Sequence, residues 1–345
     1  MTTGLRAFRR IQVGSEGATP GTAVDATEIL YGTLATWMEN RTIVQPEEDR
    51  NNLSRHMADA FVAGKEAALV WTGLLNSRHV IYLLSMAIRG NVTPTQPDPT
   101  NEPLAYLWTF APSLTAPNTP DQTNGIETFT IEFGDNLQAY EAEFCFATRL
   151  EISGRPNEGV MFTCDISARQ RSDASFTGEL VAQTVQHFPF NLAKFCVDTS
   201  GAGLGGTQKT GLLKAFTWTL ETEFRASYGA DGSLYFYAVD KEARKRVQLR
   251  LVYARNSDSD SERTKYEGNT ATFLRIKVEG ATELDAEQDN VPYVYLDGAY
   301  EYFEWPTPGD EDGLSTVEVL AESVYDATWA KQFQVAVLTD LDAIP

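Results

Sequence analysis

The sequence predicts a mainly β protein made of two tandem β-sandwich units with a short flanking helix. Three observations support this prediction: many short stretches alternate apolar and polar residues, one stretch alone has helical spacing, and matching stretches occur in the same order in both halves. The chain has 345 residues, of which 42% are hydrophobic, enough for a substantial core. We expect the units to span 1–189 and 190–345.

Strands are predicted wherever apolar residues recur at every second position. The stretch "YEAEFCFATRLEIS" predicts one apolar face, comprising Ala142, Phe144, Phe146, Leu150 and Ile152. Its opposite face carries Glu141, Glu143, Arg149 and Glu151. The stretches "ETFTIEF", "GVMFTCDISA", "VQLRLVYA", "FLRIKVE", "STVEVLAE" and "FQVAVL" predict further strands.

One segment, "NSRHVIYLLSMAIRG", has apolar residues at helical spacing. Asn76 or Ser77 is placed to cap its start, and Gly90 to end it. The Pro- and Asn-rich stretches "NVTPTQPDPTNEP" and "APNTPDQTNG" predict loops.

The glycine-rich stretch Asp198 to Leu213, "DTSGAGLGGTQKTGLL", invites comparison with a phosphate-binding loop. Gln208 stands where that motif needs glycine before Lys209, so the spacing does not fit. The following residues alternate with period two and predict a strand, which provides no helix N-terminus for an anion. We therefore interpret the stretch as a strand connection.

An internal repeat supports that interpretation. "IQVGSEGATPGTA" near the N-terminus matches "FCVDTSGAGLGGTQ" in the middle of the chain. The matches continue in order: "GTLATW" with "AFTWTL", "KEAALVWTG" with "KRVQLRLVY", and the helix near Asn76 with "NSDSDSERTKYEG". Next come "YLWTFAP" with "FLRIKVE", "YEAEFCFATRLEISG" with "VPYVYLDGAYEYFEW", and "GVMFTCDISARQ" with "GLSTVEVLAESVYD". Seven matches in one order indicate two copies of one unit.

Composition excludes several classes of protein. The net charge of −20 and a pI near 4.5 argue against tight nucleic-acid binding, which needs Lys and Arg on phosphates. No apolar run has membrane-spanning length, and the N-terminus lacks the apolar core of a signal peptide. Cys145, Cys164 and Cys196 lie in strand-like stretches, which favours buried thiols in a reducing compartment.

No motif predicts catalysis, a metal site or a cofactor. The three histidines are scattered, and neither H-E-x-x-H nor G-x-S-x-G occurs. "DSDSE", with Asp258, Asp260 and Glu262, lacks the glycine of a calcium loop, and "PGDEDG" is similar. We interpret both as exposed acidic loops and leave a weak cation site open. A sequence does not reveal whether two scattered carboxylates converge as a glycosidase pair.

At this point the chain resembles the tail tube proteins, or major tail proteins, of long-tailed (siphovirus-type) bacteriophages. The resemblance covers nearly the whole chain. It rests on "VGSEGATPGTAVDAT", "RTIVQPEEDR", "AALVWTGLLNSRHVIYLLSMAIRG", "YEAEFCFATRLEISG", "GADGSLYFYAV" and "VYDATWAKQFQVAVLTDLDAIP".

The resemblance implies a virion protein, made in the host cytoplasm, whose rings stack into a hollow tube that double-stranded DNA traverses without specific binding. Shorter relatives form hexameric rings from one sandwich unit, so a chain with two units implies a ring of three chains, a pseudo-hexamer. Its inner sheets would close into a barrel in the oligomer. Tape measure, tail terminator and tail tip proteins are the implied partners, with no membrane anchor, no cofactor and no enzymatic activity.

A channel for DNA would also explain the acidic composition, because carboxylates that line the channel repel the phosphates of DNA. Our candidates for the lining are Glu141, Glu143, Glu151, Glu221 and Glu223. The segment from Arg41 to Lys65 lies between two predicted strands, is long for a hairpin turn, and mixes apolar and charged residues. We interpret it as an arm that contacts the adjacent ring, with Arg225 to Lys245 as its counterpart. The arm candidates are Ile43, Val44, Glu47, Glu48, Asp49, Arg50, Leu53, Arg55, Met57 and Phe61.

Two alternatives remain open at this stage. A carbohydrate-binding or adhesin-like module would need an exposed aromatic cleft, which the Tyr-rich "YVYLDGAYEYFEW" could supply. A hydrolase with scattered carboxylates is the second alternative.

Overall fold

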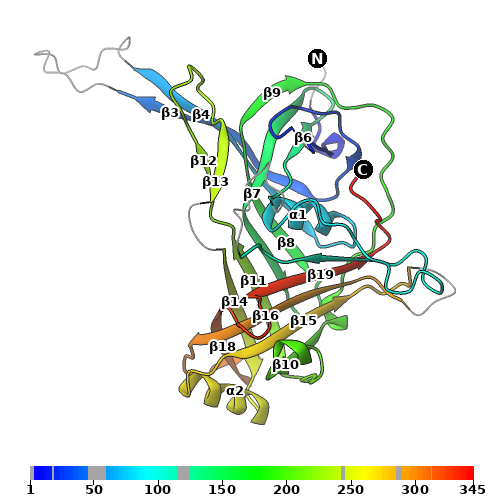
Figure 1. The fold of residues 1–345 in the computed structure, drawn as a ribbon, viewed down its shortest axis with the longest axis vertical. Helices are drawn as coiled ribbons and strands as arrows, with labels where there is room; N and C mark the ends of the chain where they lie inside the picture. The colour runs from blue at the N-terminus through cyan, green and yellow to red at the C-terminus, as the bar shows by residue number, and fades with distance from the viewer. Residues whose placement is uncertain are drawn as a thin grey trace, which may run out of the picture.

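The structure, a computed structural model, describes residues 4–17, 19–45, 60–114, 125–241, 245–284, 290–311 and 313–345. These residues form a mainly β, sandwich-like fold, as the alternating pattern predicts, with two α-helices (Figure 1). Seventeen of the described strands are hydrogen-bonded into one network, and β12 and β13 form a separate hairpin.

The first half of the chain contains nine strands, a 3-10 helix and one α-helix among its described residues. In order these are η1 (Arg6–Phe8), β1 (Arg10–Ser15), β2 (Glu28–Ile29), β3 (Thr33–Val44), β4 (Phe61–Leu74), α1 (His79–Ala87), β5 (Tyr106–Phe110), β6 (Phe129–Gly134), β7 (Ala139–Gly154), β8 (Met161–Ala168) and β9 (Gln170–Ala174).

The second half has ten strands in the part described. In order the elements are η3 (Phe190–Leu192), β10 (Lys194–Asp198), η4 (Gly201–Gly203), β11 (Leu213–Glu221), β12 (Phe224–Ser227), β13 (Ala238–Lys241), β14 (Arg246–Ala254), α2 (Ser257–Glu267), β15 (Thr272–Glu279), β16 (Tyr293–Glu304), β17 (Gly309–Glu311), β18 (Leu314–Ser323) and β19 (Phe333–Thr339).

The order of strand pairing is the same in both halves. In the first half β1 pairs with β6, β6 with β7, β7 with β8, β8 with β4, and β4 with β3. In the second half β10, β15, β16, β18, β14 and β11 pair in the same sequence. α1 follows β4 and α2 follows β14, so the helices also occupy corresponding places.

This pairing agrees with six of the seven sequence matches and corrects one. The stretch "YLWTFAP" forms β5, which pairs with β19 of the other half, whereas "FLRIKVE" forms β15, which pairs with β10 and β16. The strand that corresponds to β15 by pairing is β6. The match between β5 and β15 was therefore wrong, because two apolar strands of similar length look alike without their partners.

Two strand pairs join the halves, β5 with β19 and β7 with β11. β11 pairs with β14 on one side and with the C-terminal half of β7 on the other, with Trp218 opposite Ile152. This junction makes a continuous layer of eight strands in the order β3-β4-β8-β7-β11-β14-β18-β16, which we call the long sheet.

One face of the long sheet packs into the core. Alternation along its strands buries every second residue, as in β8, where Phe162, Cys164 and Ile166 are buried. α1 packs against this core with all nine of its residues buried. The predicted cap residue Asn76 accepts hydrogen bonds from the N–H groups of Arg78 and His79 at the start of the helix, while Arg78, at the N-cap position, makes no side-chain capping hydrogen bond. The three cysteines are buried, as expected.

The alternation prediction fails at a bend in β7. Phe144 has a φ of 56°, and the register with β8 shifts between Ala147 and Arg149. Leu150 and Ile152 therefore face the main core, whereas Phe144 and Phe146 pack in a second cluster against the β12–β13 hairpin, with Phe224, Phe236 and Val239. The single apolar face predicted for this strand was wrong, because a bulge reverses the side on which each residue points.

The stretch "DSDSE" is helical and not an exposed loop. It opens α2, where Asn256 and Ser259 form a capping box and Asp258 and Asp260 lie in the first turn. Glu262 is buried and contacts Lys265 Nζ at 2.8 Å and the Tyr302 hydroxyl at 2.9 Å. Its carboxylate is thus occupied within the chain, so these three residues do not form a calcium-type loop.

Candidate assembly surfaces and channel face

The outward face of the long sheet carries paired charges. Arg149 of β7 contacts Glu151 of the same strand, Glu221 of β11 at 3.3 Å and Asp165 of β8 at 3.9 Å. Further along the sheet, Arg246 pairs with Glu322 at 2.8 Å, and Arg250 pairs with Glu318. These strands thus present five carboxylates against three guanidinium groups, each of which has a carboxylate partner.

Two of the five predicted lining residues, Glu151 and Glu221, lie together on this face, on paired strands β7 and β11. Glu141 and Glu143 lie in the N-terminal half of β7, which pairs with β6 and β9 and not with β11. Glu143 is buried and accepts a hydrogen bond from Arg169 Nε at 2.8 Å. Glu223, with a φ of 58°, stands at the corner between β11 and β12.

Glu141 is in a different electrostatic setting from the paired residues. Burial, together with the neighbouring Glu132 and Glu143, raises its pKa.

The carboxylates on the outward face of the long sheet that sequence reasoning did not select are Asp165, Glu318 and Glu322. Their alternation with buried neighbours in β8 and β18 was a usable signal, because they point away from the core at every second position.

The glycine-rich stretch is organised by its own first residue. The Asp198 carboxylate accepts hydrogen bonds from the N–H groups of Gly205 at 2.8 Å and Thr207 at 2.9 Å. Lys209 pairs with Asp258 at 2.7 Å, and the stretch continues into strand β11. Two of its N–H groups and its lysine side chain therefore bind carboxylates of the chain, as suits a strand connection.

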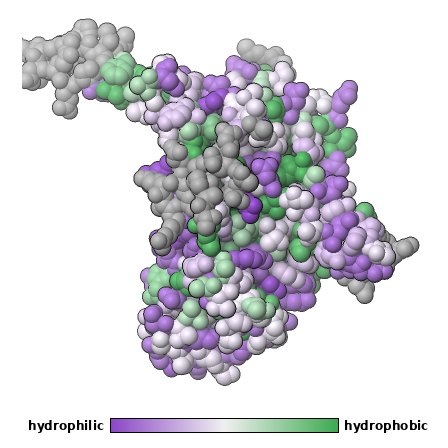
Figure 2. All heavy atoms as spheres, viewed as in Figure 1, coloured by the Kyte–Doolittle hydropathy of each residue, from purple (hydrophilic) through white to green (hydrophobic). Residues whose placement is uncertain are grey.

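The arm is longer and more regular than the sequence indicated. β3 and β4 continue as a paired hairpin to Val44 and Phe61, so both ends of the predicted Arg41–Lys65 connection are strand. The hairpin projects from the body (Figure 1). Its described end is apolar (Figure 2), with Ile43 53% and Phe61 57% exposed. The remaining arm candidates lie outside the described residues: Glu47, Glu48, Asp49, Arg50, Leu53, Arg55 and Met57.

The predicted counterpart of the arm lies against it. The hairpin of β12 and β13 runs beside β3 and β4 in Figure 1. The Lys65 N–H donates to the Leu234 carbonyl at 2.7 Å, and the Tyr228 hydroxyl lies 3.4 Å from Glu66 Oε2. Both hairpins therefore stand on the same side of the molecule.

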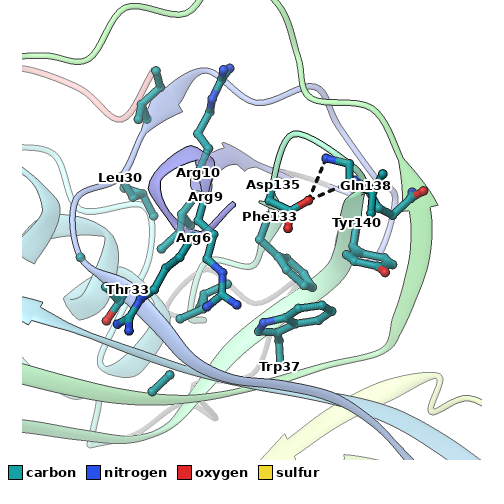
Figure 3. A pocket seen from close by; sticks show the side chains of 17 residues that line it. Arg6, Arg9, Arg10, Leu30, Thr33, Trp37, Phe133, Asp135, Gln138 and Tyr140 are labelled. Atoms are coloured by element: carbon teal, nitrogen blue, oxygen red, sulfur yellow. Dashed lines mark hydrogen bonds between the residues drawn. The ribbon is translucent and has the colours of Figure 1, made fainter. Parts of the chain in front are cut away.

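An arginine-lined groove opens beside β3. A cavity of about 590 Å³ lies between η1, β3 and the turn that joins β6 to β7. Arg6 and Arg9 lie on one side of it, and Trp37, Phe133 and Tyr140 on the other (Figure 3). Arg6, Arg9 and Arg10 are all exposed. Within the described residues, no carboxylate forms an ion pair with Arg6 or Arg9.

A buried polar cluster fixes the start of α1. The Tyr82 hydroxyl donates to Glu28 Oε2 at 2.6 Å, and His79 Nε2 lies 3.5 Å from Glu28 Oε1. His79 Nδ1 accepts from the N–H of Tyr31 at 3.1 Å, so this histidine is held neutral with its proton on Nε2. Burial lowers the pKa of His79, although Glu28 opposes the shift.

The tyrosines of strand β16 form core, stacking and cation–π contacts. Tyr300 and Tyr302 are buried, and Tyr293 and Tyr295 stack at 4.2 Å beneath Lys277. Over the described ranges no cluster of three or more metal-ligating side chains occurs. Neither described α-helix has the length and apolar character needed to cross a membrane.

A scan of the chain against protein-family models finds no match, and a search of curated proteins finds none either.

Proposed function

We propose that this protein is a structural subunit of a bacteriophage tail tube, in which rings of the chain stack into a channel for double-stranded DNA. The observation that carries the proposal is the edge-to-edge junction of β7 with β11, which joins two halves of like pairing order into one sheet. Like pairing order in both halves supports a tandem duplication of one unit.

The same junction repeated between chains gives a closed ring. The long sheet ends at β3 on one side and at the C-terminal part of β16 on the other. Within the described residues, β3 pairs with β4 alone, and the end of β16 pairs with β18 alone, so each leaves one strand edge open. β3 corresponds by pairing to β11, and β16 corresponds to β7. Each chain therefore carries both halves of the junction at its ends, and ring closure removes the exposed strand edges.

Three chains would close such a ring with six units. The outward face of the long sheet would then line the bore. Its arginines are held by carboxylates on the same face, so few cations remain for DNA phosphates. This arrangement favours DNA that slides without sticking, which the overall charge of −20 reinforces.

The paired hairpins suit stacking of one ring on the next. The arm extends its apolar end away from the body, where Ile43 and Phe61 cannot be buried within the described part of the same chain. Exposed apolar groups of this kind indicate a protein interface. Arms that reach to an adjacent ring would bury them.

Electron microscopy of the purified protein tests the proposal. Rings or tubes with a central channel are the expected result, either spontaneously or after addition of a tail tip complex as nucleus. A compact monomer under both conditions would contradict it. Carbohydrate binding or glycosidase activity in such a monomer would instead support one of the two alternatives.

A further inference from the structure

At the junction inside the chain, the turn that joins β7 to β8 packs against the segment before β10. The residues that connect β7 to β8 reach the segment before β10: the N–H of Phe190 donates to the carbonyl of Glu158 at 3.1 Å, and Gly159 bridges to Pro189. The rings of Phe190 and Phe216 lie 6.1 Å apart. A Cβ on Gly154 would come within 2.6 Å of the Phe190 ring and 2.7 Å of the Phe216 ring, so the fit is tight.

The arginine-lined groove is the corresponding place in the first half. η1 ends two residues before β1, as η3 does before β10, so Arg6 stands where Phe190 stands. Leu34 of β3 corresponds to Phe216 of β11. Leu34 lies opposite Trp71 of β4, and Phe216 lies opposite Leu251 at the matching position of β14. Both Arg6 and Leu34 line the cavity. In the second half the β7–β8 turn of the first half packs against this place, whereas in the first half the place is open.

The turn that would fill it is at the far end of the chain. β17 and β18 form the hairpin that corresponds to the β7–β8 connection, with Gly309 opposite Thr316 and Glu311 opposite Leu314. The sequence of this turn is acidic, with Asp310 and Glu311 followed by Asp312, which lies outside the described residues. Asp310 is exposed, and Leu314 is 59% exposed.

We propose that the groove between η1 and β3 receives the acidic β17–β18 turn of a second copy of this chain. The occupant follows from two independent observations: the internal junction packs the corresponding turn against the corresponding place, and the charges are complementary. Arg6, Arg9 and Arg10 line the groove. The one carboxylate among its lining residues, Asp135, accepts hydrogen bonds from the N–H groups of Leu137 and Gln138, and the turn is acidic. Where the internal junction uses stacked phenylalanines, the junction between chains uses ion pairs. This inference rests on the proposed ring.

Complementary charge at this place sets the direction of assembly. The basic groove attracts the acidic turn, whereas two grooves or two turns carry like charges and repel each other. Chains therefore associate head to tail, as a ring requires. Exposed ion pairs are screened by salt, with a Debye length of about 8 Å at physiological ionic strength. Ring formation should therefore weaken as salt rises.

Charge reversal with rescue tests the inference. Arg6→Glu with Arg9→Glu should weaken ring formation at least tenfold, measured by mass photometry over a concentration series, and Asp310→Lys with Glu311→Lys should do the same. Arg6, Arg9 and Asp310 are exposed, so each variant should keep the circular dichroism and melting temperature of the parent. The four changes combined should restore ring formation to within about threefold of the parent.

The matched control is Arg263→Glu, which reverses an exposed arginine of α2 paired with Glu267 and should leave ring formation unchanged. Parent rings that persist in both reversed variants, or a combined variant that fails to recover, would overturn the inference while leaving the ring itself intact. A parent chain that never forms rings would contradict the proposed function as well.

Discussion

At the residue scale, the burial of His79 makes stability depend on pH. Burial holds the pKa of His79 below its usual value, so the unfolded chain binds a proton that the folded chain resists. Stability is therefore fully present above the ordinary histidine pKa of about 6.5 and is lost as pH falls below it toward the lowered folded value.

We expect the free energy of unfolding to fall between pH 7 and pH 5 by about 1.4 kcal/mol for each unit by which the folded pKa is lowered. Urea denaturation at several pH values measures this slope. His79→Gln removes the titrating group and should flatten the slope, even though the variant is less stable at neutral pH. A slope that persists unchanged in that variant would assign the pH dependence to other groups.

The paired charges on the outward face of the long sheet give a second prediction at this scale. Glu151→Lys with Glu221→Lys would leave Arg149 beside two new cations, with Asp165 at 3.9 Å as its remaining carboxylate. Because exposed ion pairs are worth about 1 kcal/mol or less, the chain should still fold and assemble. Assembled rings should gain affinity for double-stranded DNA, and that affinity should fall steeply with salt.

A filter-binding or fluorescence-anisotropy titration at two salt concentrations measures this gain. Asp260→Lys with Glu267→Lys, which makes the same charge change on α2, is the control and should leave DNA binding as weak as in the parent. Equal DNA binding by the two variants would remove the long sheet from the lining of the bore.

At the element scale, the arm is a paired hairpin and not a loop, so its test must preserve the strands. Replacing residues 45–60 by a short Gly-Ser turn keeps β3 and β4 paired from Thr33 to Val44 and from Phe61 onward. We expect a folded variant that forms rings but few long tubes, because the part removed carries the charged arm candidates. Tube lengths in electron micrographs measure the effect.

A shortened arm that still gives tubes of parental length would show that the described hairpin and the sheet faces suffice for stacking. Ile43→Ser with Phe61→Ser then separates the contributions, because it changes only the exposed apolar end of the described hairpin. Loss of long tubes in that variant alone would assign stacking to this apolar end.

Sequence periodicity predicted the elements well where alternation is unbroken. β8, β14 and β18 bury every second residue as expected, and the Asn76 cap is where the sequence indicates. Prediction failed where tertiary pairing decides. The bulge in β7 sends Phe144 and Phe146 to a second cluster, and no local pattern announces it.

The candidate site was predictable only in part. Alternation put Glu151 and Glu221 on polar faces, but only the pairing of β7 with β11 shows that these faces are one surface. The arginine-lined groove escaped sequence reasoning, because Arg6, Trp37 and Tyr140 come from three distant segments. The acidic stretch at α2 was misread as a loop, since a capping box beginning at Asn256 with serine in place of glutamate is a weak local signal.

At the scale of the whole molecule, the proposed ring depends on the equivalence of the two halves. The halves share their order of strand pairing and the place of their helices, and β7 pairs with β11 between them. In the ring that we propose, a chain with two such units and an open strand edge at each end would close with half as many copies as a one-unit chain. Three copies would present six units around the bore.

The mass of isolated rings tests this claim most directly. With a chain mass of 38.2 kDa, native mass spectrometry should give rings of three chains, and images of the same rings should show six-fold-like symmetry. Rings of six full-length chains would contradict the account, because each chain would then contribute a single unit to the bore and the equivalence of the two halves would have no role in closing it.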